Sequence, residues 1–240
     1  MPIRKIWRES RSRFVFILVA LLVLTGASLF YDAQAEEVVI ESKDFHEAGL
    51  RTIRGVLFPF WAISAMFLGL GGFLRERAVG SLDYTLSLPV SRTRWFLYRA
   101  LNGALQSVAA ALIPALAVPV LAALFGGDYP VGDALLLGLR IGLGGLLFYA
   151  LGLLTSTLFA GDYASAGIGL ALVFVLTKGT RVFETFERLN LQDAVIPMDM
   201  IDRSTNLIHG QMPWHGIAFS LVLSLMLSAL AWKVTSATDF

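Results

Sequence analysis

Residues 74–99 read LRERAVGSLDYTLSLPVSRTRWFLYR, a charged segment interrupted by Gly80 and Pro89. The runs on either side, residues 56–73 and 100–125, contain no Lys, Arg, Asp or Glu. Each run is long enough to cross a hydrocarbon layer of about 30 Å as a helix. The alternation therefore predicts a membrane span, a loop and a second membrane span.

The composition of the chain also indicates a membrane protein. Of the 240 residues, 56% are hydrophobic and 15% are charged, and the mean hydropathy is +0.70. A soluble domain has about a quarter of its residues charged. The net charge of +1 provides no basic surface for a nucleic-acid partner. The absence of cysteine excludes disulfides, thiolate metal sites and cysteine nucleophiles.

Six apolar segments predict an all-α membrane protein with one transmembrane domain over residues 1–240. The expected spans are about residues 14–31, 56–74, 95–125, 134–159, 164–182 and 217–234.

The first thirteen residues contain five basic side chains, and apolar residues recur among them at spacings near three and four. This pattern predicts an amphipathic helix on the cytoplasmic surface before the first span. A signal peptide is the alternative, because Ala33-Gln34-Ala35 resembles a cleavage site. The long first apolar run and the spans that follow it favour a retained first span.

The distribution of basic residues predicts the orientation. Of the 19 Lys and Arg residues, eleven lie in the N-terminus, the loop at residues 75–99 and the C-terminus, and seven lie in the polar segments 32–54 and 178–214. Because cytoplasmic segments carry the basic excess, both termini and the loop at residues 75–94 are expected inside. Segments 32–54 and 183–214 are expected outside, and the chain is expected to be a multi-pass protein of the cell membrane.

Arg140 is the only charged residue deep in an apolar run. Desolvating an arginine at the bilayer centre costs at least about 2.5 kcal/mol, so such a residue is a candidate for function. Arg140 also lies seven residues from Asp133, which would allow it to extend to the outer headgroups or to form a structural pair. Two interpretations therefore stay open: structural pairing or snorkelling, and a place on a translocation path.

Small residues favour close helix packing in three of the expected spans. Gly138 and Gly142 form a GxxxG spacing in the fourth span, and a glycine cluster closes the second. In the third span small residues recur every four positions, at Gly103, Ser107, Ala111 and Ala115.

Common catalytic motifs are absent from the sequence. It contains no GxxxxGK[ST] phosphate loop, no HExxH zinc motif and no GxSxG nucleophile elbow. His46, His209 and His215 lie in or beside segments expected outside, without metal-ligand spacing. We therefore expect no catalytic residue, no metal and no bound cofactor, and a protein that moves or anchors something.

Within the central segment, Val79, Leu82 and Leu86 share one helical face. Leu88-Pro89-Val90 ends this short helix, and Ser91 is a suitable N-cap for the third span. Such an amphipathic helix suits docking into a groove on a cytoplasmic partner. An ordinary positive-inside loop with an interfacial helix is the alternative.

The spacing of Glu76, Gly80, Leu82, Leu86 and the run LPVSR at residues 88–92 resembles the cytoplasmic loop of ABC-2 type transporter permeases. Bacterial members of that family carry the pattern "RERE.GTL..LLSLPVSR" between their second and third spans. Ala78 stands where a second acid is common, and Ser81 replaces a frequent threonine. The motif covers about twenty residues, while the order of spans and the chain length match the family more generally.

The resemblance implies a permease subunit of an ATP-driven transporter, with an exporter as the expected direction. Loop 75–94 would be a coupling helix that docks on a separate ABC ATP-binding subunit, which would bind ATP and Mg²⁺. A second permease copy or a related permease, together with membrane lipids, would complete the assembly. The residues carried over to the coupling contact and its turn, with Arg77 added on grounds of charge, are Glu76, Arg77, Gly80, Leu88, Pro89 and Arg92.

Two other classes of function compete with the transporter. A non-transporting membrane anchor or assembly factor would use the same loop to recruit a cytoplasmic partner. A membrane-embedded enzyme is disfavoured, because the spans lack clusters of acids or histidines.

Overall fold

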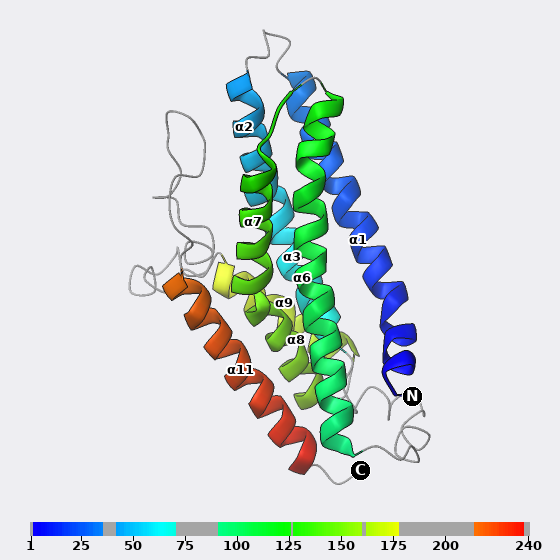
Figure 1. The fold of residues 1–240 in the computed structure, drawn as a ribbon. Helices are drawn as coiled ribbons and strands as arrows, with labels where there is room; N and C mark the ends of the chain where they lie inside the picture. Colours follow the sequence, from blue (N-terminus) through cyan, green and yellow to red (C-terminus); the bar gives the residue numbers. More distant parts are fainter. Residues whose placement is uncertain are drawn as a thin grey trace.

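A computed structural model describes residues 2–35, 42–70, 91–125, 127–159, 162–177 and 214–237, which form helices and short connections without a strand. Figure 1 shows the helices gathered into one bundle. The start of α1 (Pro2–Ala35), the start of α6 (Arg92–Leu124) and the end of α11 (Trp214–Ala237) lie at its lower end. The expected all-α membrane architecture is confirmed, and both termini lie at one end of the bundle.

α1 is one continuous helix, although the sequence predicts a separate surface helix before a span at residues 14–31. Between Pro2 and Gly26 the chain contains no proline or glycine that would end a helix. The part of α1 that is apolar enough to span a membrane is Ser10–Tyr31. A separate N-terminal surface helix is therefore not confirmed.

The second span begins earlier than the sequence predicts. α2 (Ser42–Arg51), a π-helical turn at Thr52–Leu57 and α3 (Phe58–Gly69) follow one another without a break, and the candidate span is Glu47–Gly69. The polar segment 32–54 is thus helical among its described residues. α3 ends at Gly69, and residues 71–74 of the predicted second span lie outside the described residues. The cause is a buried helical face, because Leu50, Ile53 and Leu57 are 7%, 0% and 1% exposed.

The π-helical turn lies directly before Pro59. Proline has no backbone N–H to donate, and its ring clashes with the carbonyl group four residues earlier, which here belongs to Gly55 within the turn. Widening the helix at this point accommodates the proline without interrupting the chain's helical path.

The third span agrees with its predicted bounds of residues 95–125. α6 begins after Ser91, whose Oγ accepts a hydrogen bond from the backbone N–H of Arg94 at 3.4 Å. The expected N-cap is therefore confirmed. α6 continues across Pro114 and Pro119 to Leu124.

The fourth span, predicted as one helix over residues 134–159, is divided into α7 (Val131–Gly144) and α8 (Leu146–Leu158). Gly145 separates them with φ −94° and ψ 5°. A Cβ atom at Gly145 would overlap the ring of Trp61, so the break coincides with close packing of α3 against the polypeptide backbone. Val131–Leu158 nevertheless forms one candidate membrane span, in agreement with the predicted fourth span, and the turn at Gly145 within it depends on tertiary packing.

The last two predicted spans differ in how fully the structure describes them. α9 (Asp162–Thr177) contains the shorter apolar helix Tyr163–Leu176, and residues 178–182 of the predicted fifth span lie outside the described residues. α11 covers the predicted sixth span at residues 217–234. Five described helical segments are long and apolar enough to cross a membrane, so six spans remain a prediction.

α3 and α8 cross at a pair of glycines. A Cβ atom on Gly69 would lie 2.7 Å from the backbone N of Leu153, and one on Gly152 would overlap the carbonyl oxygen of Met66. Phe148 of α8 adds edge contacts to Phe58 and Trp61, with ring centroids 6.1 and 6.4 Å apart. The predicted close approach of helix backbones at the end of the second span is therefore confirmed at Gly69.

α6 and α7 pack through the small residues that the sequence singles out. A Cβ atom on Gly138 would lie 3.0 Å from that of Ala115, and one on Gly142 would lie 3.2 Å from Val108 Cγ1. Ser107, Ala111 and Ala115 are fully buried. The small-residue stripe of the third span and the GxxxG spacing of the fourth therefore serve helix packing, as expected.

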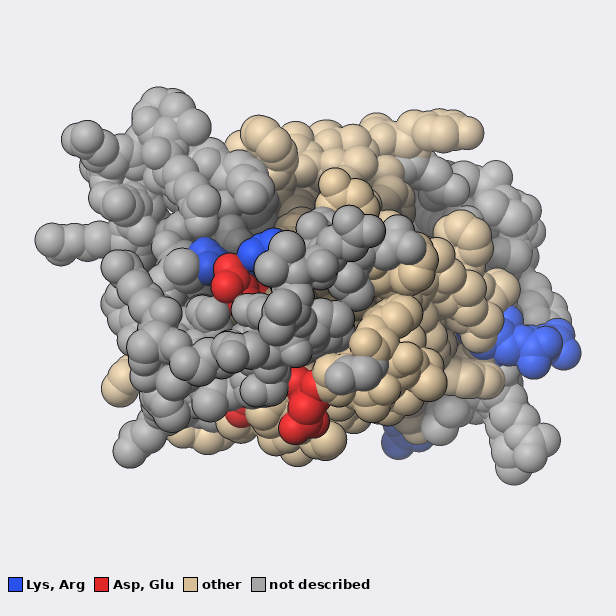
Figure 2. Space-filling model, turned by 90° about the horizontal axis from the view of Figure 1, so that it is seen from above, with Lys and Arg blue, Asp and Glu red and all other residues tan. Residues whose placement is uncertain are grey.

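The outside of the bundle is largely apolar, as a lipid-facing surface requires. Phe16, Leu124 and Leu225 have exposed fractions of 75%, 75% and 69%. Figure 2, which looks onto the upper end of the bundle in Figure 1, shows acidic and basic side chains in small groups among other residues. The exposed pair Glu47 and Arg51, joined at 2.8 Å, belongs to α2 at this end.

Candidate functional site

The candidate coupling segment lies between α3 and α6, and most of it is outside the described residues. Arg92 is the first residue of α6, and its side chain is not described. The predicted site residues that lie outside the described part are Glu76, Arg77, Gly80, Leu88 and Pro89. The structure therefore describes the two flanks of the segment.

The flank at the end of α3 is held by backbone and side-chain hydrogen bonds. Leu70 leaves the helix with φ −66° and ψ 132°, and its N–H donates to the carbonyl oxygens of Met66 and Phe67, each at 3.2 Å. Arg13 of α1 donates from Nη1 to the carbonyl oxygen of Leu70 at 3.0 Å. A charged donor strengthens such a bond, so the residue where the chain leaves α3 is attached to α1.

The flank at the start of α6 is held by its N-cap and by aromatic contacts. The guanidinium carbon of Arg99 lies 5.0 Å from the ring centroid of Trp95, within the range of a cation–π interaction. Tyr149 of α8 donates from Oη to the carbonyl oxygen of Arg99 at 3.5 Å. Gly103 makes room for this side chain, because a Cβ atom there would lie 2.5 Å from Tyr149 Oη.

A polar cluster joins α1 to α6 about one to two turns beyond Arg99. Ser10 Oγ accepts hydrogen bonds from Asn102 Nδ2 at 3.0 Å and from Gln106 Nε2 at 2.8 Å. The sequence analysis does not identify this cluster. The signal for it is the pair of amide side chains four residues apart within the apolar run of the third span, because such residues face one side of a helix.

Arg140 lies in α7 with its side chain 1% exposed. It is flanked along the helix by Gly138 and Gly142, which contact α6 closely. The structure therefore places Arg140 in the interior of the bundle, and Asp133 lies half-buried in the first turn of the same helix. A positive charge in this position is available to an internal ion pair or to a polar path.

The connection between α6 and α7 lies at the other end of the bundle. Tyr129 is buried there, and a Cβ atom on Gly49 of α2 would lie 2.5 Å from its ring. Burial, and secondarily the negative charge of Asp133, raise the pKa of the Tyr129 hydroxyl above its usual value. Tyr129 therefore acts as a neutral packing residue at neutral pH.

Among the described residues, no set of three or more His, Cys, Asp or Glu side chains could hold a metal ion. The features that remain are two anchored flanks, a polar cluster between α1 and α6, and a buried arginine.

A known protein family matches almost the whole chain. The family described as "ABC-2 family transporter protein" matches residues 5–236, which include every described helix almost completely. No curated protein matches the chain. Together with the apolar helices, the family match identifies a transmembrane protein of ABC transporters, and the resemblance of the loop at residues 74–99 is confirmed at the level of the family. The chain belongs to the ABC-2 transporter family.

Proposed function

We propose that the chain is the membrane-spanning permease subunit of an ATP-driven exporter. A separate ABC ATP-binding subunit supplies ATP hydrolysis and binds ATP and Mg²⁺. The observation that carries the proposal is the family match over residues 5–236, which contains the LPVSR loop between α3 and α6. The absence of a GxxxxGK[ST] motif supports a separate motor subunit.

The proposed topology has six spans with both termini in the cytoplasm of a bacterial cell. α9 and residues 178–182 form the fifth span, and the segment 183–214 lies outside. The positions of the termini at one end of the bundle support an even number of spans (Figure 1). The excess of basic residues in segments assigned to this end supports a cytoplasmic location for it.

In this proposal the loop 75–94 is the coupling element. Glu76, Arg77 and Gly80 contact the ATP-binding subunit, while Leu88, Pro89 and Arg92 form the turn into α6. The hydrogen bonds from Arg13 to Leu70 and from Tyr149 to Arg99 support this role, because they attach both flanks of the loop to neighbouring helices of the bundle.

We further propose that two permease copies, identical or related, enclose the path, and that Arg140 has an interior role. Its burial supports either a structural pairing or a place on the translocation path. Arg140→Gln separates the two roles. Structural pairing predicts a lower unfolding temperature, because loss of one partner leaves a buried charge uncompensated. A path role predicts an unchanged unfolding temperature with altered stimulation of ATP hydrolysis in the assembled complex.

The direct test is co-expression of the full chain with a candidate ABC ATP-binding subunit from the same organism, followed by affinity purification and measurement of ATP hydrolysis in vesicles. We expect a stable complex whose ATPase rate falls at least several-fold in the Glu76→Gln variant. Asp128→Asn is the matched control, because Asp128 is an exposed acid in the α6–α7 connection, at the opposite end of the bundle. The control should retain the rate of the unmodified complex.

The alternative function is a membrane anchor or assembly factor. An anchor predicts that the complex forms but that Glu76→Gln and a bulky substitution of Gly80 leave ATP hydrolysis unchanged. Failure to form any complex would contradict both functions. Equal losses in Glu76→Gln and Asp128→Asn would contradict the assignment of the loop as the coupling element.

A further inference from the structure

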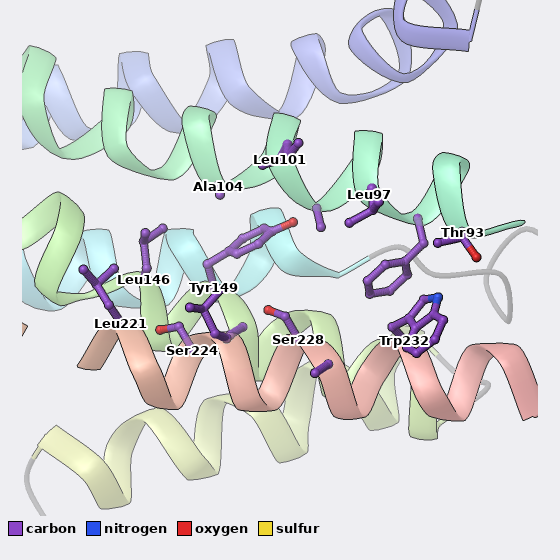
Figure 3. A pocket seen from close by; sticks show the side chains of 15 residues that line it. Thr93, Leu97, Leu101, Ala104, Leu146, Tyr149, Leu221, Ser224, Ser228 and Trp232 are labelled. Atoms are coloured by element: carbon purple, nitrogen blue, oxygen red, sulfur yellow. The ribbon is translucent and has the colours of Figure 1, made fainter. Parts of the chain in front are cut away.

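A groove runs between α6, α8 and α11 in the half of the bundle that contains the two termini (Figure 3). Its volume is about 400 Å³, within the range of about 300–1,000 Å³ for small-molecule sites. Leu97 and Leu101 of α6 and Leu225 of α11 line it and are 50%, 60% and 69% exposed. The groove is therefore open toward the surface that faces lipid.

The length of the groove corresponds to one leaflet of a membrane. On α6 the lining residues extend from Thr93 to Ala104, and on α11 from Leu221 to Trp232. Each pair is separated by eleven residues, which at 1.5 Å per residue gives about 16 Å. Half of a hydrocarbon core of about 30 Å is about 15 Å. The length of each groove wall therefore matches the thickness that the acyl chains of one leaflet occupy.

The inner surface of the groove is suited to a hydrocarbon. Most of its lining side chains are apolar, and two of its hydroxyl groups already donate to backbone carbonyl oxygens. Tyr149 Oη donates to Arg99, and Ser224 Oγ donates to Ser220 at 2.7 Å. A ligand in the deep part of the groove therefore gains from apolar burial and has little need for polar groups.

Among the described residues, the charged ones beside one end of the groove are basic. Thr93 and Trp232 lie together at this end in Figure 3, and each is followed in the chain by an exposed basic residue, Arg94 and Lys233. The sequences of α6, α8 and α11 contain no Asp or Glu. Tryptophan is enriched where hydrocarbon meets headgroups, so Trp232 marks the level of the membrane interface. A phosphate at that level would lie beside the helical turns that carry these two basic residues.

We propose that this groove binds one anionic phospholipid of the leaflet on the side of the termini. One acyl chain lies between α6, α8 and α11, and the negatively charged headgroup lies beside Arg94 and Lys233. The match in length selects an acyl chain, and the charge complementarity selects an anionic headgroup over a zwitterionic one. The site does not depend on the proposed export function, since lipid binding requires neither ATP nor a partner subunit.

The test uses the full chain purified in a mild detergent and titrated with phosphatidylglycerol or phosphatidylcholine of identical acyl chains, with bound lipid counted by native mass spectrometry. We expect one lipid to be retained, with phosphatidylglycerol bound more tightly. A basic residue near a membrane surface contributes about 1 kcal/mol toward anionic lipid, which is about fivefold in affinity. The double variant Arg94→Gln, Lys233→Gln should therefore lose most of the preference while still binding phosphatidylcholine.

A second pair of variants tests the position of the acyl chain. Ala229→Phe places a ring in the groove, because Ala229 is an exposed lining residue of α11. Ala218→Phe is the matched control, since Ala218 is an exposed alanine of the same helix outside the groove. We expect at least fivefold weaker binding of both lipids by Ala229→Phe and unchanged binding by Ala218→Phe. Ala104→Phe, at the deep end of the groove, should reproduce the effect of Ala229→Phe.

Three results would overturn the proposal. Equal lipid binding by Ala229→Phe, Ala104→Phe and the unmodified chain would exclude the groove as the site. Equal affinity for the two lipids in the unmodified chain would exclude recognition of the anionic headgroup. Dissociation of a dimer by Ala229→Phe, without a change in bound lipid, would show that a second copy of the chain occupies the groove.

Discussion

Gly152 lies at the point where α8 crosses α3, and its replacement by alanine tests the packing of the bundle directly. The added Cβ atom would overlap the carbonyl oxygen of Met66 and lie 2.9 Å from the carbonyl carbon of the same residue. Real Cβ contacts essentially never fall below 3.0 Å. Because these neighbours are backbone atoms, no side-chain rotation can relieve the overlap, and the two helices must move apart.

The expected cost follows from the loss of contacts on both sides of the crossing. A gap of about 0.5–1 Å forfeits a quarter to a half of each dispersion contact. Overpacking in a well-packed interior costs about 1–3 kcal/mol, and the rigid neighbours place Gly152→Ala in the upper half of that range. For a chain of this length, 1 kcal/mol corresponds to a change in Tm of about 2–4 °C, so we expect a decrease of about 4–12 °C.

The assay is thermal unfolding of the purified full chain in detergent, followed by circular dichroism. Gly167→Ala in α9 is the matched control, because a Cβ atom there has no neighbour within 4 Å. Alanine is favoured over glycine inside a helix by about 0.5–1 kcal/mol, so the control should equal or exceed the unmodified chain in Tm. A Tm for Gly152→Ala within about 1 °C of the unmodified value would refute the close crossing, because the expected decrease is several times larger. An equal decrease in Tm for Gly152→Ala and Gly167→Ala would refute it as well.

Three further predictions address single contacts. Trp61→Phe should lower the free energy of unfolding by about 1–2 kcal/mol, because Trp61 Nε1 donates to the backbone carbonyl oxygen of Ser107 at 2.8 Å in the core. Equal midpoints of chemical unfolding for Trp61→Phe and the unmodified chain would contradict this contribution. Ser10→Ala should cost about 1–3 kcal/mol, because it leaves the two amide donors of α6 without their acceptor; Ser12→Ala, at an exposed position of the same helix, is the control in the same unfolding assay. Tyr129→Phe should reduce the loss of folding stability that occurs as the pH rises above about 10, the ordinary tyrosine pKa. At that pH the tyrosine ionises in the unfolded state, while the raised pKa of Tyr129 keeps its hydroxyl neutral in the folded state. Below that pH this group contributes no pH dependence, and parallel unfolding curves for the two proteins at pH 8 and pH 11 would contradict the prediction.

The features that the sequence predicts correctly are those with local causes. Ser91 is an N-cap because its hydroxyl group follows Pro89 closely in the sequence and precedes a helix-forming run. Ala115 and Gly138 lie in stripes whose period is visible along one helix, so their packing role follows from spacing alone. Membrane spans are recognised for the same reason, because hydrocarbon thickness fixes the length of an apolar helix.

The features that the sequence does not predict depend on distant partners. The break at Gly145 follows from the ring of Trp61, which is more than eighty positions away in the chain. The early start of the second span depends on burial of Leu50 and Ile53, which a local excess of charged residues conceals. The polar cluster requires Ser10 to meet α6, and no pattern in either helix specifies the partner of the other.

The candidate site illustrates the same division. The motif at residues 74–99 identifies the segment by its resemblance to a protein family. The hydrogen bonds that attach the flanks of the segment to other helices are seen only in the folded structure. Arg13 lies in a basic stretch whose sequence predicts only a location at the membrane surface. In the structure its guanidinium donates a hydrogen bond to the carbonyl oxygen of Leu70. A charged residue predicted for topology therefore also has a specific hydrogen-bonding role.

The hydrogen bond from Arg13 to Leu70 bears on how the proposed coupling would move the helices. α1 contacts both flanks of the segment between α3 and α6, through Arg13 at the end of α3 and through Ser10 at α6. A displacement of the loop by a docked ATP-binding subunit would therefore move α1 together with α3 and α6. α8 is joined to the same flank by the hydrogen bond from Tyr149 to Arg99. The start of α6 is thus the point at which a force applied to one short loop would be divided among the helices of the permease.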